Sequence, residues 1–233
     1  MNEFDPTWAF RVVDVTGVLA NGLLGGAVAR THRFDAVGFV VLAIASGLGG
    51  GMLRDVLLNR LPVALTDPWY LGGALVSAAV AYLLTLEGRP ARRLLAVADV
   101  LALGCWSATG ASKALGIGLG WMPAVMLGVI TAVGGGVIRD ILVNRVPAIF
   151  GGSPLCATVA VVGSVEMVLL QGAGHPEAGM ALSIVTCAAL GLVARRRRWM
   201  LPGPGAFSLP RPRWRPRRHP GPRRPRDRHD GAW

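Results

Sequence analysis

The chain has 233 residues, of which 52% are hydrophobic and only 16% are charged, and its formal net charge is +11. The excess charge is confined to one end, because residues 195–233 hold 13 of the 24 basic residues and two of the 13 acidic ones, whereas residues 1–194 hold 11 of each. A neutral body with a mean hydropathy of +0.49 excludes a disordered chain. It also excludes a soluble domain that binds nucleic acid, because such a domain carries its basic residues on its folded surface.

Seven apolar segments recur along the chain, and each is a candidate membrane helix, since about 20 apolar residues cross about 30 Å of hydrocarbon. They lie near residues 11–29, 36–53, 69–86, 94–114, 121–138, 154–171 and 178–194. Glu3 and Asp5 stand where a secretory signal would be basic, so we expect the first segment to be a permanent span. The sequence therefore predicts an all-α integral membrane protein with seven transmembrane helices.

Basic residues between these segments predict how the helices are oriented. Lysine and arginine concentrate on the cytoplasmic side of a membrane, and Arg195–Arg198 directly follow the seventh segment. The first and third connections are also basic, with Arg30 and Arg33 in one and Arg89 in the other. We therefore expect a multi-pass protein of the bacterial cell membrane with its N-terminus outside and its C-terminus in the cytoplasm. The basic tail would then contact membrane lipids with anionic headgroups.

The chain contains an internal duplication. Residues 49–62 read GGGMLRDVLLNRLP and residues 134–147 read GGGVIRDILVNRVP, an offset of 85 at which Val12–Leu65 match their counterparts in 16 of 54 positions. Each copy holds three helices, so the two copies cross the membrane in opposite directions, as in the inverted repeats of transport proteins. The expected parts are an external segment (1–10), two inverted three-helix repeats (11–89 and 90–174), a seventh helix (175–194) and a disordered Arg/Pro-rich cytoplasmic tail (195–233).

Runs of three glycines stand inside the second and fifth apolar segments. They comprise Gly49, Gly50 and Gly51 in the first copy, and Gly134, Gly135 and Gly136 in the second. Because glycine permits unusual backbone conformations, these runs predict kinked or unwound helices whose freed carbonyl groups bind alkali cations. The alternative interpretation is a patch where two helix backbones pack closely.

An Arg–Asp pair follows each glycine run, as Arg54–Asp55 and as Arg139–Asp140. Ionisable residues within a membrane are functional candidates, and the same pair recurs in both copies. Adjacent residues point in different directions on a helix. We therefore expect these side chains to pair across the repeats, or with Asn59 and Asn144, rather than within each dipeptide.

Three further charged residues are candidates for the same site. Asp14 and Asp99 occupy equivalent positions in the two copies. They predict acidic groups near two mouths, caps for the glycine-containing helices, or plain interfacial carboxylates. Lys113 is the single lysine of the chain. Its long side chain either reaches the membrane interface or projects into a pathway.

The duplicated motif in a seven-span chain resembles the prokaryotic branch of the TRIC (trimeric intracellular cation channel) family, whose bacterial members are also grouped as a glycine-transporter-like family. The resemblance covers about residues 10–194. It implies a homotrimer with one hourglass pore per protomer, conducting monovalent cations, mainly K⁺, between glycine-kinked second and fifth helices. The motif residues that carry over are Gly49, Gly50, Gly51, Arg54, Asp55, Gly134, Gly135, Gly136, Arg139 and Asp140.

Two other functions stay open at this stage. Helix breaks also bind carboxylates in secondary transporters, so transport of a small zwitterion such as glycine is the main alternative. A membrane scaffold that uses its basic tail is the other. The sequence has no GxSxG, HExxH or P-loop motif and no cluster of metal ligands, so we expect neither an enzyme nor a cofactor.

Overall fold

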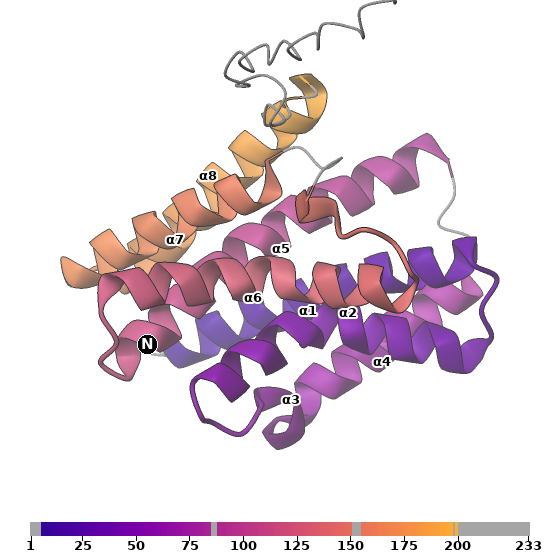
Figure 1. Ribbon diagram of the computed structural model, residues 1–233, viewed down its shortest axis with the longest axis horizontal. Coiled ribbons are helices and arrows are strands. Elements are labelled where there is room, and N and C mark those ends of the chain that lie inside the picture. Colours follow the sequence, from indigo (N-terminus) through magenta and orange to yellow (C-terminus); the bar gives the residue numbers. More distant parts are fainter. Residues whose placement is uncertain (1–5, 85–87, 151–154, 198, 200–233) are drawn as a thin grey trace, which may run out of the picture. The chain divides into compact units, whose positions relative to one another are not determined.

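The computed structural model describes residues 6–84, 88–150, 155–197 and 199, and within them every regular element is a helix (Figure 1). The elements are α1 (Pro6–Thr31), α2 (Ala36–Leu57), α3 (Val63–Thr66), α4 (Pro68–Leu83), α5 (Arg89–Gly116), α6 (Trp121–Leu142), the 3₁₀ turn η1 (Ala148–Phe150), α7 (Cys156–Gly172) and α8 (Pro176–Arg197). Seven of these helices coincide with the seven predicted segments. By length and composition, five can cross a membrane, and α4 and α7 are apolar but shorter.

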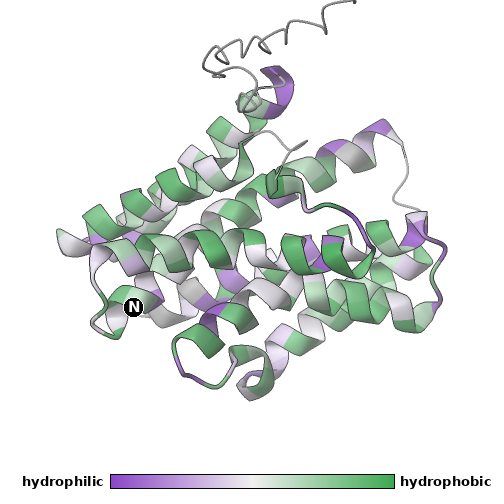
Figure 2. Cartoon of the chain, in the orientation of Figure 1, coloured by the Kyte–Doolittle hydropathy of each residue, from purple (hydrophilic) through white to green (hydrophobic). Residues whose placement is uncertain are grey.

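The surface of the bundle is apolar, as a lipid environment requires. Figure 2 shows hydrophobic residues along the helices and hydrophilic residues mainly near their ends and in connections. Large apolar side chains such as Leu61, Leu83 and Val146 are each more than three-quarters exposed. Exposed apolar surface on this scale indicates a membrane-facing exterior.

Polar side chains fix where the helices of the first repeat begin and end. Asp35 caps α2 by accepting a hydrogen bond from the N–H of Gly38 (2.9 Å), and Asp67 caps α4 by accepting one from the N–H of Trp69 (3.1 Å). At the other end of α4, the guanidinium of Arg30 donates to the carbonyl oxygens of Ala81 and two neighbouring residues. These bonds satisfy backbone groups that a helix end leaves without partners.

The two repeats have the same internal arrangement. In the first, α1 packs against α2 and α4, and in the second, α5 packs against α6 and α7. A Cβ atom on Gly25 of α1 would lie 2.3 Å from the carbonyl oxygen of Leu42, and a Cβ atom on its counterpart Gly110 would lie 2.8 Å from that of Leu127. The same glycine–leucine contact therefore joins the first two helices of each repeat.

The repeats meet through α2 and α6, which run in opposite directions (Figure 1). Helix α1 also packs against α5, and the seventh membrane helix, α8, covers α5 and α7. The expected division at residue 194 falls inside α8, which continues to Arg197. The remainder of the expected tail, apart from residue 199, lies outside the described residues.

Candidate functional site

The glycine runs form the crossing of α2 and α6. A Cβ atom on Gly50 would lie 2.2 Å from the carbonyl oxygen of Thr131, and a Cβ atom on Gly135 would lie 2.2 Å from that of Ser46. Gly134 is also close to Gly50, because its Cβ would lie 3.1 Å from the Gly50 Cα. Only hydrogen fits between the two backbones at these positions, so the runs permit a close helix crossing.

The predicted unwinding of these helices is wrong. Both α2 and α6 continue without interruption through the three glycines and end six residues after the last of them, at Leu57 and Leu142. The carbonyl groups of a continuous helix stay bonded to the next turn, so they are not released as cation ligands. The glycines instead provide close packing, which was the alternative interpretation.

The third glycine of each run makes room for the arginine that follows it. An added Cβ atom on Gly51 would lie 3.7 Å from Nη2 of Arg54, and one on Gly136 would lie 3.8 Å from Nη2 of Arg139. Each guanidinium therefore lies along its own helix, directed back over the glycine one turn earlier. A Cβ atom there would be in ordinary van der Waals contact with the guanidinium, so only a side chain longer than that of alanine would compete with it for space.

Each arginine pairs with the aspartate beside it, which corrects the expectation of pairing elsewhere. Nε of Arg54 donates to Oδ1 of Asp55 at 2.8 Å, and Nε of Arg139 donates to Oδ1 of Asp140 at 3.0 Å. The direction of the Cβ atoms does not prevent this, because the arginine side chain is long enough to fold across the helix surface. Arg54 is 1% exposed, so its charge is balanced within the protein.

The second carboxylate oxygen of each aspartate binds the next segment of the chain. Oδ2 of Asp55 accepts a hydrogen bond from the N–H of Val63 (2.9 Å), and Oδ2 of Asp140 accepts one from the N–H of Ala148 (3.2 Å). Each aspartate thus connects its helix to α3 or to η1, eight residues onward. This connection is the same in both repeats.

The asparagines of the motif form the turn between these two points. Asn59 and Asn144 adopt left-handed conformations, with φ of 52° and 53°. The N–H of Arg60 donates to the carbonyl oxygen of Asp55, five residues back, and Arg145 does the same to Asp140. This is the Schellman arrangement of a helix end, in which asparagine is one of the few residues that tolerate the left-handed position. The motif therefore specifies a helix end.

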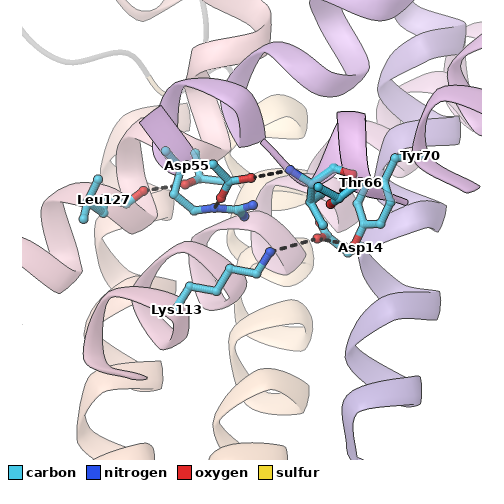
Figure 3. Close-up of polar contacts among 9 residues, drawn as sticks. Asp14, Asp55, Thr66, Tyr70, Lys113 and Leu127 are labelled. Carbon is cyan, nitrogen blue, oxygen red and sulfur yellow. Dashed lines mark hydrogen bonds and ion pairs between the residues drawn. The ribbon is translucent and has the colours of Figure 1, made fainter. Parts of the chain in front are cut away.

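Asp14 is the centre of a buried polar cluster at the Arg54 end of the bundle. Figure 3 shows Tyr70 and Lys113 directed toward it from different helices. The Tyr70 hydroxyl donates to Oδ2 of Asp14 at 2.9 Å, and Nζ of Lys113 lies 4.0 Å from the same oxygen. Lys113 also lines a cavity of about 360 Å³ with Asp55 and Arg60, so it projects inward between helices.

Asp99 has a different partner from its counterpart. It forms an ion pair with Arg195 of α8, and both side chains are 29% exposed. The seventh helix, which has no equivalent in the first repeat, therefore neutralises this carboxylate. The equivalent sequence positions of Asp14 and Asp99 give equivalent places in the fold but different surroundings.

Two cavities lie at equivalent places in the two repeats. The Arg54 cavity is lined by residues that include Asp14, Gly51, Arg54, Val63, Tyr70 and Trp106. The Arg139 cavity is lined by residues that include Asn21, Asp99, Gly136, Arg139, Asp140 and Ala148. Of the 11 residues that line the Arg54 cavity, ten have their counterparts at the offset of 85 in the lining of the Arg139 cavity. The duplication therefore includes a cavity.

The structure brings the predicted charged residues together in two groups, one at each cavity. Sequence reasoning missed three uncharged residues that line the cavities, Tyr70, Trp106 and Asn21. Trp106 and Asn21 occupy the same position in the repeat alignment, so the offset of 85 contains a signal that links them. Nothing in the alignment indicates Tyr70, whose counterpart is Leu155.

Comparison with known proteins gives consistent matches. The family model described as Glycine transporter matches residues 11–85 and 96–172. A UPF0126 membrane protein of Deinococcus radiodurans is 35% identical over 195 residues, which cover 82% of this chain and 89% of that protein. The UPF0126 inner membrane protein YadS of Escherichia coli is 33% identical over 155 residues, covering 66% and 74% of the two chains.

Solved structures extend this similarity to the fold. A structure described for conductance through TRIC cation channels has 31% identity and a TM-score of 0.75, and the match covers 83% of this chain and 96% of that one. The TRIC orthologue from Rhodobacter sphaeroides has 29% identity and a TM-score of 0.71, with 81% and 96% covered. These matches confirm the predicted all-α membrane fold and the resemblance to the TRIC family.

Proposed function

The chain belongs to the glycine transporter family, and on that premise we propose that it is a channel for monovalent cations, mainly K⁺. One pathway lies inside each protomer of a homotrimer and passes the glycine segments of α2 and α6. The observation that carries this proposal is the pair of equivalent cavities, each lined by an arginine and an aspartate, on the two sides of the α2–α6 crossing. The similar structures are described as TRIC cation channels, which supports the same function here.

The two cavities follow one another along α1. Asp14, Val18 and Asn21 share a face of this helix, because residues three and four apart lie one above another. The first two line the Arg54 cavity, and Asn21 lines the Arg139 cavity. At 1.5 Å per residue, Asp14 and Asn21 are about 10 Å apart along the axis. A single face of α1 therefore leads from one cavity into the other.

Helix α5 gives the same result in the opposite direction. Asp99 and Leu103 line the Arg139 cavity, and Trp106, one turn further, lines the Arg54 cavity. Between the two polar ends lie Val18 (2% exposed) and its counterpart Leu103 (7% exposed). The pathway is therefore polar at both ends and apolar in the middle, a pattern that gates by excluding water.

Recordings from the purified protein in planar bilayers, with unequal KCl concentrations on the two sides, test this function. We expect K⁺-selective unitary currents from the wild type. The variants Val18→Ser and Leu103→Ser should have a larger open probability, because each places a polar group in the apolar middle of the pathway. Val185→Ser on α8 is the matched control, since Val185 is 64% exposed and lines neither cavity. Absence of K⁺ current from the wild type, from Val18→Ser and from Leu103→Ser over a range of voltage and pH would contradict the proposal.

A second function, transport of a small zwitterion such as glycine, is favoured by one observation. Among the described residues, Nη1 of the buried Arg54 has no hydrogen-bond partner, and Asp14 lines the same cavity. A guanidinium and a carboxylate are the groups that bind the two charged ends of an amino acid. Saturable uptake of radiolabelled glycine into proteoliposomes, abolished by Arg54→Lys, would favour transport; uptake that excess unlabelled glycine does not reduce would exclude it.

The orientation of the protein is a separate proposal, which rests on the basic connections between the helices. The Arg139 end lies on the side of the basic connections, so we propose that it faces the cytoplasm and that the N-terminus is outside. A cysteine or a protease site placed before Trp8 would then be modified from outside in intact cells. Modification only after the cells are broken would reverse the assignment.

A further inference from the structure

The two cavities differ most at one pair of equivalent positions. Trp106 of α5 lines the Arg54 cavity, and its repeat counterpart, Asn21 of α1, lines the Arg139 cavity. The duplication therefore places a large aromatic ring at one end of the pathway and a small amide at the other. No other pair of corresponding lining residues differs as much in size.

The volumes of the two cavities differ in the direction that this exchange predicts, since the cavity with the tryptophan is the smaller one. The Arg54 cavity has a volume of about 10 Å³, and the Arg139 cavity has about 80 Å³. A volume of about 10–15 Å³ is the least that holds one water molecule. The Arg54 cavity thus holds at most a single water, although the cavity of about 360 Å³ lined by Asp55 and Lys113 adjoins it at Val63, whereas the Arg139 cavity has room for several.

The remaining lining residues do not account for the difference. Met52 is larger than its counterpart Val137, but Ala64 is smaller than its counterpart Ile149. Val18 is likewise smaller than Leu103, so these three exchanges taken together would enlarge the Arg54 cavity and cannot explain why it is the smaller one. Two large residues remain at the Arg54 end: Trp106, which stands in place of asparagine, and Tyr70, whose counterpart Leu155 does not line the Arg139 cavity. Of these, Trp106 is the one with a direct counterpart in the other lining.

Trp106 is held in place from α1. Its side chain is 4% exposed, and its Nε1 atom lies only 2.8 Å from the point where a Cβ atom on Gly17 would be. Gly17 therefore forms the surface on which the indole ring lies. The counterpart of Gly17 is Ala102, so the Arg139 cavity has neither the ring nor an equivalent glycine beneath it.

We propose that Trp106 closes the Arg54 half of the pathway, and that Asn21 at the equivalent position keeps the Arg139 half hydrated. This inference rests on the proposed pathway within each protomer. It makes Trp106 the residue that determines which end is open in this conformation. Exchanging the two residues should exchange the open and closed ends.

Thiol labelling from each side of the membrane tests this inference without relying on conduction. Reporter cysteines are placed at the equivalent lining positions, Ala64→Cys and Ile149→Cys, in the full-length protein with its three native cysteines changed to alanine. A membrane-impermeant methanethiosulfonate is then added to one side of oriented proteoliposomes. With Trp106 and Asn21 in place, we expect the Ile149→Cys thiol to react at least severalfold faster, and only from the Arg139 side.

Substitutions at Trp106 and at Asn21 should then change these labelling rates in opposite directions. Trp106→Asn should raise the Ala64→Cys rate severalfold from the Arg54 side, and Asn21→Trp should lower the Ile149→Cys rate. Trp106→Phe is the matched control and should change the Ala64→Cys rate least, because it keeps an aromatic ring in the cavity. If Trp106→Asn does not fold, the Asn21→Trp arm still tests the proposal.

Two results would overturn the inference. One is equal labelling of the two reporters before either substitution. The other is unchanged labelling in the folded exchange variants. Loss of K⁺ current with the expected labelling pattern would instead remove the proposed function and leave the asymmetry of the cavities established.

Discussion

In the first repeat Asp14 accepts a hydrogen bond from Tyr70 and lies 4.0 Å from Lys113, whereas its counterpart Asp99 pairs with Arg195. At the ends of α2 and α6, by contrast, the two repeats form the same hydrogen bonds. Each arginine pairs with the adjacent aspartate, and each aspartate holds the backbone N–H eight residues onward. One part of the duplication is thus strictly repeated, and another has diverged.

This comparison separates two roles. The repeated motif fixes a close helix crossing, a helix end and the start of the next segment, all of which both halves need. Among the residues that line the cavities, those that have diverged, such as Trp106 and Asn21, differ in size. We infer that the duplicated residues build the framework, and that the residues that differ between the halves determine what each end admits.

The largest loss of stability is expected at the crossing of α2 and α6, where the two repeats touch. Gly50→Ala and Gly135→Ala should each destabilise the fold by about 3 kcal/mol or more, because each new Cβ atom would lie 2.2 Å from a backbone carbonyl oxygen that cannot move aside. The two losses should be similar, since the crossing is symmetric. Thermal unfolding in detergent, followed by size-exclusion chromatography, measures them.

Gly72→Ala on α4 is the matched control. A Cβ atom there has no other atom within 4 Å, so alanine should be neutral or should stabilise the helix by about 1 kcal/mol. A Gly135→Ala protein as stable as Gly72→Ala would show that the helices can separate at no cost. The crossing would then not be the rigid centre of the molecule.

An effect of comparable size in the first repeat, but unequal between the halves, is expected at the aspartates. Asp55→Asn keeps the size of the side chain but leaves the charge of Arg54, which is 1% exposed, without a counterion. Breaking such a buried pair costs about 3–5 kcal/mol. Asp140→Asn should cost about 1–3 kcal/mol, because the side chain of Arg139 is 16% exposed and borders the larger cavity.

The double variant Arg54→Gln with Asp55→Asn distinguishes charge from shape. It removes the lone charge, so it should recover part of the stability that Asp55→Asn loses. Equal losses for Asp55→Asn and Asp140→Asn would mean that the two ends are equally hydrated. That result would also weaken the argument from cavity volume.

The framework was predictable from sequence, and the cavities were not. Seven apolar runs predicted the helices, and the offset of 85 predicted the inverted repeat, because both depend on patterns along the chain. The pairing of Arg54 with Asp55 was missed because helix geometry places Cβ atoms but not the end of a long, flexible arginine. Trp106 and Asn21 were missed because they differ, whereas the repeat attracts attention to identities.

One ion pair belongs to the first repeat alone and is the smallest of the three effects. Arg11 and Asp67 lie 2.7 Å apart, and the equivalent positions hold Ala96 and Gly152. Burial raises the pKa of Asp67, but the hydrogen bonds from Arg11 and from the backbone N–H of Trp69, with the charge of Arg11, outweigh it and leave the pKa below its ordinary value. The folded state therefore favours the ionised carboxylate.

The pH dependence follows from that direction. A lowered pKa stabilises the fold above the unfolded value of about 3.9, and the contribution disappears as the pH falls through the lower folded value. Because the side chain of Arg11 is 44% exposed, the pair should contribute at most about 1 kcal/mol. Asp67→Asn retains a helix-capping side chain and removes only the charge. Its melting temperature should therefore lie slightly below that of the wild type at pH 7, and the difference should disappear once the pH is below the folded pKa of Asp67. A difference in melting temperature that persists unchanged in acid would assign the effect to the helix cap of α4. The charge of Asp67 would then not be the reason that the first repeat needs this side chain.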